Sequence, residues 1–228
     1  MSIREVVRRR RADDAGVTLA ELLVTIMIFG IVLTVVTGTF VSLTRATTQA
    51  GTTDQNVRQA SNGMNELTRE IRGAVNNPVP NLPDAAAFSI ATTESMTLST
   101  AVNQSGSATQ PQLVNFALGS DRSLIETKTT AVSFQNTYWQ FTGVVSKRTL
   151  TGPVSVSSAS IPVLFQYFDS TGTVLAPNAQ GALTAAQMGT IASVTVTLSI
   201  KSTQVVDTGV TLANTVGLPN LGATGPVS

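Results

Sequence analysis

The longest apolar stretch of the chain covers residues 17–43. It is interrupted only by Glu21 and by scattered Thr, Gly and Ser residues. Its 27 residues exceed the roughly 20 that an α-helix needs to cross a bilayer. The pattern therefore predicts a membrane-spanning helix over residues 17–43.

A second pattern follows, in which apolar or small residues recur at three- and four-residue steps. These positions are Val57, Ser61, Met64, Leu67, Ile71 and Val75. Charged residues lie between them, which is typical of an amphipathic helix with one face to bury. The Pro-rich residues 76–84 should end this helix, because a residue before a proline is pushed out of α geometry. We expect helix from Val17 to Ala74.

From residue 85 onward the period changes to that of strands. The alternation is clearest where Val194, Val196, Leu198 and Ile200 share one face. Residues 117–128 and 166–177 resemble hairpins, with Gly-Ser-Asp and Asp-Ser-Thr-Gly as their turns. The expected strands are residues 88–91, 95–99, 113–118, 124–129, 163–168, 174–175 and 191–199. The predicted fold is α+β, with an antiparallel sheet packed on the C-terminal half of the long helix.

The composition narrows the possible functions. Charged residues make up 12% of the chain, about half the share usual in a soluble domain, which favours a membrane or densely assembled setting. The chain has no Cys and no His, which excludes disulfides, Cys- or His-ligated metals and imidazole catalysis within it. A formal net charge of +1 gives no argument for direct nucleic-acid binding. We expect a protein that is not an enzyme and holds no cofactor or metal.

Four consecutive arginines, Arg8 to Arg11, precede the apolar stretch and place that end in the cytoplasm by the positive-inside rule. A cleaved secretory signal has an apolar core of about 7–15 residues, so this stretch is too long for one. A plain signal anchor fits the length and orientation but gives Glu21 no purpose. A charge at the centre of a membrane helix costs roughly 2.5–3.5 kcal/mol, and less near its end.

The segment AGVTLAELLVTIMIFGIVL resembles the class III signal of type IV pilins and pseudopilins. That family has a short basic leader ending in Gly, then Phe-Thr-Leu-x-Glu-Leu and an apolar helix. Gly16 stands at the end of the leader, Val17 is the first mature residue, and Glu21 is the family's glutamate. Val17 replaces the usual Phe, and the family's peptidase generally tolerates other apolar residues there.

The resemblance implies a processing scheme and a set of partners. A prepilin peptidase would cut between Gly16 and Val17 and methylate the new amine of Val17. Glu21 would compensate the N-terminal charge of a neighbouring subunit, since buried charges are tolerable only when paired. The implied partners are this peptidase, other pilin or pseudopilin subunits and an inner-membrane assembly platform. The implied location is the cytoplasmic (inner) membrane, single-pass with the C-terminal head outside, and then an extracellular or periplasmic filament.

Helix packing gives a further signal. Gly30, Thr34 and Gly38 are spaced four residues apart and form a stripe of small residues, which lets helices approach closely in lipid. The alternative is that Gly and Thr are simply common in membrane helices. Gly38 also stands where many pilins carry a helix-breaking proline.

Within this family the head resembles the J-type pseudopilins and W-type minor pilins. The shared features are the helix segment MNELTREIRGAV, the hairpin before IASVTVTLSIKS, and a late strand VTLAN with Ala213 where Arg is frequent. Alternatives are a competence pilus subunit for DNA uptake and a signal-anchored surface protein that does not polymerise. The expected organisation is leader 1–16, membrane helix 17–43, amphipathic helix 44–75, Pro-rich connection 76–84, β-rich head 85–214 and disordered tail 215–228.

Three other features of the sequence are candidate sites. Asp169 with Ser170 and Asn178 suggests a calcium loop, but the carboxylates are too few, and a plain turn is favoured. Residues 103–105 form a glycosylation sequon, which is uninformative alone. The aromatic cluster of Tyr138, Trp139 and Phe141 favours a core or interface role over a ligand site.

Overall fold

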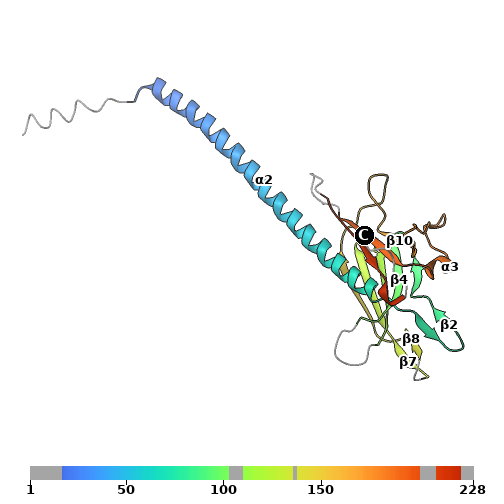
Figure 1. Ribbon diagram of the computed structural model, residues 1–228. Helices are drawn as coiled ribbons and strands as arrows, with labels where there is room; N and C mark the ends of the chain where they lie inside the picture. Colours follow the sequence, from blue (N-terminus) through green and yellow to red (C-terminus); the bar gives the residue numbers. More distant parts are fainter. Residues whose placement is uncertain (1–16, 103–109, 136–137, 201–208, 222–228) are drawn as a thin grey trace, which may run out of the picture. The chain divides into compact units, whose positions relative to one another are not determined.

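The computed structural model describes residues 17–102, 110–135, 138–200 and 209–221 (Figure 1). By its internal contacts the chain divides into two compact units, Met1–Gly51 and Thr52–Ser228. A long N-terminal helix followed by antiparallel sheets confirms the predicted α+β class.

Helix α2 spans Leu19–Arg72, and the boundary between the two units falls inside it. It begins two residues later and ends two residues earlier than expected. At its C-terminal end the backbone N–H of Gly73 donates to the carbonyls of Arg69 and Glu70, at 3.2 and 3.1 Å. Ala74 then forms a β-bridge with Thr100, so the chain has already left the helix before the first proline.

The larger sheet of the second unit has five antiparallel strands in the order β3-β4-β5-β6-β9. They are β3 (Phe88–Ala91), β4 (Ser95–Thr100), β5 (Gln112–Leu118), β6 (Leu124–Thr130) and β9 (Val145–Thr151). The β5–β6 hairpin confirms the turn predicted in residues 117–128, with Leu118 opposite Leu124. Strand β9, an edge strand, was not anticipated.

The smaller sheet has three antiparallel strands in the order β10-β11-β12. They are β10 (Phe165–Phe168), β11 (Ser193–Ile200) and β12 (Val210–Gly217). Val194, Val196, Leu198 and Ile200 of β11 are at most 1% exposed, which confirms that they share a buried face. Residues 174–175 do not form a strand, although Val174 makes a single bridge with Phe168 that closes the predicted hairpin.

The remaining elements are short. Strand β1 (Asn77–Val79) pairs with β2 (Leu82–Ala85), and β7 (Val132–Phe134) pairs with β8 (Tyr138–Gln140). The expected Pro-rich connection therefore contains a small hairpin. Helix α3 (Ala185–Met188) is closed by a capping box between Thr184 and Gln187, and a 3-10 turn covers Pro219–Leu221.

The expected boundary between head and tail at residue 215 differs from the structure. Strand β12 continues to Gly217 because Val216 is buried opposite Val194 of β11. Leu218, 1% exposed, extends the core further. Residues 222–228 of the expected tail, and the whole expected leader, lie outside the described residues.

The core of the second unit lies where α2 meets both sheets. Helix residues Ala60, Met64, Leu67 and Ile71 are buried, whereas Val57 remains 37% exposed, so burial begins one turn later than expected. Gly63 allows close approach: a Cβ atom there would lie 3.1 Å from Thr151 Cγ2 on β9 and 3.7 Å from Leu198 Cδ1 on β11.

Candidate functional site

Thr18 and Glu21 close the start of α2 with reciprocal hydrogen bonds. The backbone N–H and the hydroxyl of Thr18 both donate to Oε2 of Glu21, each at 3.1 Å. The backbone N–H of Glu21 donates to Oγ1 of Thr18 at 3.3 Å. Since the N–H of Leu22 donates to the carbonyl of Thr18 at 3.1 Å, Thr18 is the N-cap residue and the pair is a capping box.

The predicted processing residues lie at this same end of the helix. Val17 is the first described residue and is 72% exposed, while Gly16 lies outside the described part. Glu21 has a role within its own chain, as a cap, that the sequence analysis missed. The sequence itself indicates this cap, because Thr-x-x-Glu before an apolar run is the pattern of a capping box.

The apolar part of α2 has no packing partner among the described residues of its chain. From Val17 to Thr48 every residue is exposed. Among the described residues α2 is the helix long and apolar enough to cross a membrane, and none of its most apolar 18-residue window is buried. A surface of this kind is stable only against lipid or against similar helices.

Several threonine hydroxyls in this part bond to the helix itself. Each donates to the backbone carbonyl four residues earlier, at 2.7–2.9 Å: Thr25 to Glu21, Thr34 to Gly30, Thr39 to Val35, and Thr44 to Phe40. A hydroxyl satisfied within its helix can face an apolar medium at little cost.

The predicted small-residue stripe is open. A Cβ atom on Gly30 or Gly38 would have no neighbour within 4 Å. Thr34, between them, has its hydroxyl turned back to the carbonyl of Gly30. The stripe is thus an open strip of the helix surface, without neighbours among the described residues, against which another helix could pack.

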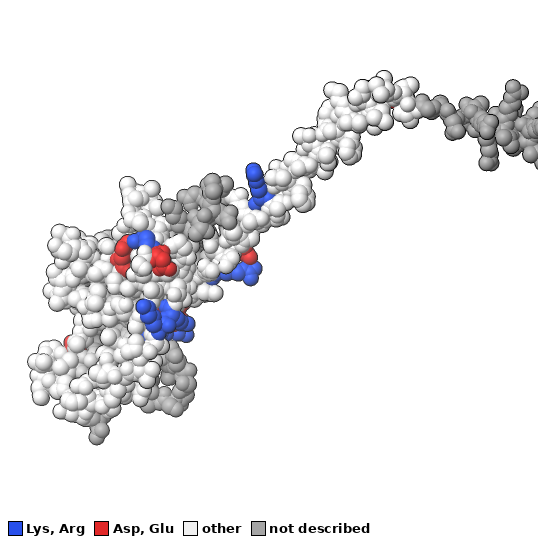
Figure 2. Space-filling model, turned by 180° about the vertical axis from the view of Figure 1, so that it is seen from behind, with Lys and Arg blue, Asp and Glu red and all other residues white. Residues whose placement is uncertain are grey.

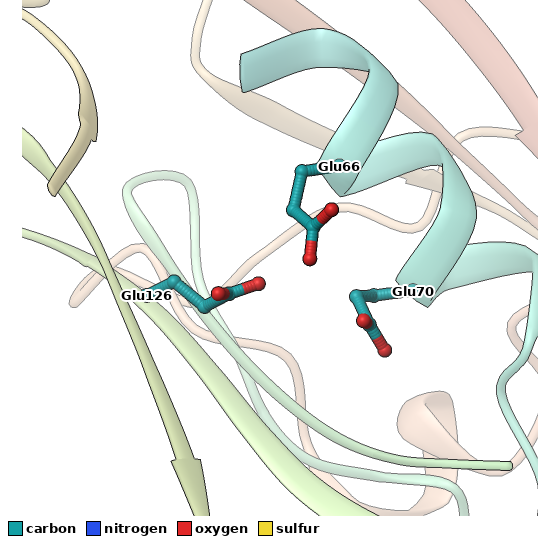
Figure 3. Close-up of side chains that lie close together, drawn as sticks. All are labelled: Glu66, Glu70 and Glu126. Carbon is teal, nitrogen blue, oxygen red and sulfur yellow. The ribbon is translucent and has the colours of Figure 1, made fainter. Parts of the chain in front are cut away.

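The second unit contains a cluster of charged side chains that the sequence analysis did not predict. Glu66 and Glu70 come from α2 and Glu126 from β6, and the three carboxylates point toward one another (Figure 3). The ammonium of Lys128, also on β6, donates to Glu66 Oε1 at 2.8 Å and to Glu70 Oε1 at 2.6 Å. Glu70 and Glu126 are at most 1% exposed.

Two arginines complete the cluster. Arg148 of β9 donates to Glu126 Oε2 at 2.5 Å and also pairs with Glu66. Arg69 of α2 pairs with Glu66 at 2.6 Å. The cluster therefore joins one helix to two neighbouring strands, and its three carboxylates face three cations.

The pKa shifts in the cluster follow from this pairing. Burial opposes the charged form of Glu66, but the hydrogen bond and charge of Lys128, with the charges of Arg148 and Arg69, hold its pKa below the usual value. Burial likewise opposes the charged form of Lys128, and its hydrogen bonds to Glu66 and Glu70 raise its pKa nonetheless. The hydrogen bond to Glu126 raises the pKa of Arg148. All three charges are stabilised by folding.

Three carboxylates this close could in principle hold a cation. The position between them is taken by the Lys128 ammonium, which also lies 3.3 Å from Glu126 Oε1. Among the described residues Glu70 Oε2 is buried without a hydrogen-bond partner, and Glu126 Oε1 has this ion-pair contact but no hydrogen bond. The arrangement is that of a buried ion-pair network holding α2 on the sheet.

On the face seen in Figure 2, charged side chains form a few small groups on a mostly uncharged surface. The described residues on this face therefore show no basic patch of the kind that binds nucleic acid.

The remaining candidate sites have local structural roles. Asp169 Oδ1 accepts hydrogen bonds from the N–H groups of Thr171 and Thr173, both at 2.9 Å, and from the Thr171 hydroxyl, which confirms the turn interpretation. Trp139 is half-buried in β8, where Asn77 Nδ2 reaches its carbonyl at 3.4 Å. The sequon at residues 103–105 lies outside the described residues.

Comparison with known families gives a match at the N-terminus. Residues 11–37 match the prokaryotic N-terminal methylation motif. The matched range includes Gly16, Val17, Glu21, Gly30 and Thr34, and ends just before Gly38. No curated protein matches the chain. The match supports a processed, type IV pilin-like N-terminus anchored by the apolar helix.

Proposed function

We propose that this chain is a non-enzymatic minor pilin or pseudopilin, a subunit of a type IV pilus or of a type II secretion-like filament. It is cleaved between Gly16 and Val17, methylated at the amine of Val17, and assembled through its apolar helix. The observation that carries the proposal is the methylation motif lying on a helix whose apolar surface is exposed and has no partner in the part of the chain that the structure describes.

Glu21 has the central role in this assembly. It is the only charged residue between Asp14 and Arg45, and the cleaved chain would present a cationic amine four residues before it. In an apolar filament core each of these charges needs the other, so Glu21 pairs with the amine of a neighbouring subunit. The stripe formed by Gly30, Thr34 and Gly38 lets neighbouring helices approach closely.

The proposal extends to the subtype of pilin and to its location in the membrane. The order of the elements, with the 166–177 hairpin before β11 and β12, supports a J-type pseudopilin or a W-type minor pilin. Before assembly the chain is single-pass in the cytoplasmic membrane, with residues 52–228 on the outer side, as the arginines at positions 8–11 favour. Its partners are the prepilin peptidase, sibling subunits and the assembly platform.

Two measurements test the proposal. N-terminal sequencing of the chain from peptidase-competent cells should begin at Val17 and show a methylated amine. Glu21→Ala and Glu21→Gln should both be processed yet be lost from sheared filaments, with Thr39→Ala as a control in the same helix. An N-terminus that is never cut, or Glu21→Gln entering filaments as the unaltered chain does, would contradict the proposal.

A further inference from the structure

A small cavity lies beside Trp139, where the segment after α2 meets β1, β4 and β8. Its volume is about 170 Å³, and its walls include Val75, Asn77, Pro78, Ser99, Pro111 and Trp139. A cavity of about 150 Å³ takes a molecule the size of benzene, so this one has room for a single six-membered ring. Pockets for drug-sized ligands are larger, at about 300–1,000 Å³.

One wall of the cavity carries an unmet hydrogen-bond acceptor. Oδ1 of Asn77 is buried and has no hydrogen-bond partner among the described residues. The other end of the amide sets its orientation, because Nδ2 faces the carbonyl of Trp139 at 3.4 Å, where an oxygen would be repelled. Nearby, Asn76 Oδ1 already accepts the N–H of Ala87 at 3.0 Å, and the hydroxyl of Ser99 already donates to a backbone carbonyl. A ligand in this cavity therefore needs a donor for Asn77.

The other walls restrict the chemistry of that ligand further. None of the described residues that line the cavity is ionisable, so a charged group would lose its hydration there without gaining a partner. A purely apolar ring would leave Oδ1 of Asn77 buried without a donor, which costs free energy. The indole of Trp139 has a weakly negative face, on which the weakly positive C–H groups of a sugar ring can stack. A neutral ring that carries hydroxyl groups meets all of these conditions.

We infer that this cavity is a subsite for one neutral sugar ring, which stacks on the indole of Trp139 and donates a hydroxyl to Oδ1 of Asn77. Such a hydroxyl can displace a water molecule from this oxygen because it makes the same hydrogen bond. The sequence alone favours a core or interface role for Trp139; the fold adds the cavity and the unmet acceptor beside it. The subsite lies within the second unit and is independent of how the apolar helix assembles.

Trp139 is the single tryptophan of the chain, so its fluorescence reports directly on the cavity. The full chain, in a detergent that contains no sugar, is titrated with the methyl glycosides of glucose, galactose and mannose and with N-acetylglucosamine. At least one of them should give a saturable change with a Kd on the order of 1 mM, since a single ring buries little surface. The uronic acid of the sugar that binds best, which adds a carboxylate, should bind about tenfold more weakly or less.

Two substitutions test the assigned contacts. Asn77→Ala should weaken binding about tenfold through the loss of one hydrogen bond. Trp139→Leu, followed by saturation-transfer NMR of the sugar, should abolish binding. The control is Gln140→Ala on the same strand, whose side chain alternates to the opposite face of β8 and should leave binding unchanged. Unchanged binding by folded Asn77→Ala would overturn the inference.

Two outcomes on the unaltered chain would also overturn it, and neither depends on a variant folding. The first is no saturable binding of any of the four sugars up to about 100 mM. The second is tighter binding of p-cresol, measured by the same NMR experiment, than of every sugar. Because p-cresol mimics a tyrosine side chain, that result would assign the cavity to a partner protein instead.

Discussion

The ammonium of Lys128 on β6 donates a 2.6 Å hydrogen bond to Glu70 on α2, although the two residues are 58 positions apart in the sequence. Glu70 is fully buried and Lys128 is 9% exposed. This pair, with Glu66, Glu126 and Arg148 around it, fixes the last turns of the helix on the larger sheet.

Removing one partner of this pair should be strongly destabilising. Lys128→Met removes the closer of the two cations that pair with the buried Glu70 and leaves it only the half-exposed Arg69 at 3.2 Å, so we expect a loss of about 3 kcal/mol in the free energy of unfolding. Unfolding by guanidinium in detergent, followed by the fluorescence of Trp139, the single tryptophan, measures it.

The matched control for that change is Arg58→Met. Arg58 pairs with Asp54 on the same helix, but both side chains are more than 60% exposed. Such a pair contributes about 0.5 kcal/mol or less. Equal effects of the two substitutions would mean that the buried network does not hold the helix.

The free energy of unfolding of the second unit should fall both at acid pH and at alkaline pH. The pKa of Glu66 is lower in the folded chain, so its contribution is present above the unfolded value of 4.5 and is lost as the pH falls through the folded pKa. The pKa of Lys128 is raised, so its contribution is present below 10.5 and is lost as the pH rises through the folded pKa.

Unfolding midpoints measured across this range should therefore form a plateau between the two limits and fall on either side of it. In Lys128→Met the alkaline fall should become smaller. An alkaline limb that is unchanged in this variant would assign the effect to other groups, such as Tyr167, whose pKa burial also raises.

Two glycines near the end of α2 should respond differently to alanine. At Gly63 the new Cβ meets side-chain atoms of Thr151 at 3.1 Å, and the gain in helix propensity of about 1 kcal/mol should offset this contact. At Gly73 the new Cβ would lie 2.5 Å from both Thr100 Oγ1 and Val102 Cγ2. Gly73→Ala should cost about 1–3 kcal/mol, measured by the same unfolding experiment. A larger loss at Gly63 than at Gly73 would contradict the packing described.

Filling the small-residue stripe should weaken assembly without affecting the fold. Gly30→Leu and Gly38→Leu place their side chains in open space within the single chain, so unfolding of the second unit should not change. Between closely packed helices the same side chains should cost roughly 1–3 kcal/mol. Recovery in sheared filaments measures the effect, with Val35→Leu as the control on the same helix. Unimpaired recovery of both glycine variants would exclude the stripe as a helix contact.

The elements that the sequence revealed are those with strong local patterns. The helix and β11 were predicted because each shows its own period over many residues. Strand β9 was missed because residues 145–149 are all exposed, so an edge strand leaves no alternation to detect. Strands β1 and β2 were missed because Pro78 and Pro83 argue against strand, although proline is tolerated at sheet edges.

The N-terminal motif and the buried charge cluster also differ in how far the sequence alone indicates them. Gly16, Val17 and Glu21 form a contiguous motif, so their chemistry could be proposed from the sequence. Glu70 was grouped with the charged residues between the apolar positions of the helix, and nothing near it in the sequence indicated burial. Its burial depends on Lys128, which only the fold brings beside it.

The threonines of the apolar helix have a consequence for how a filament keeps its order. Because Thr25, Thr34, Thr39 and Thr44 donate their hydroxyl hydrogens to their own backbone, they offer a neighbour no free hydroxyl donor. In the proposed filament the axial register of neighbouring helices would then depend on Glu21 at the end of the helix and on the fit of the small-residue stripe, rather than on hydrogen bonds donated by these threonines.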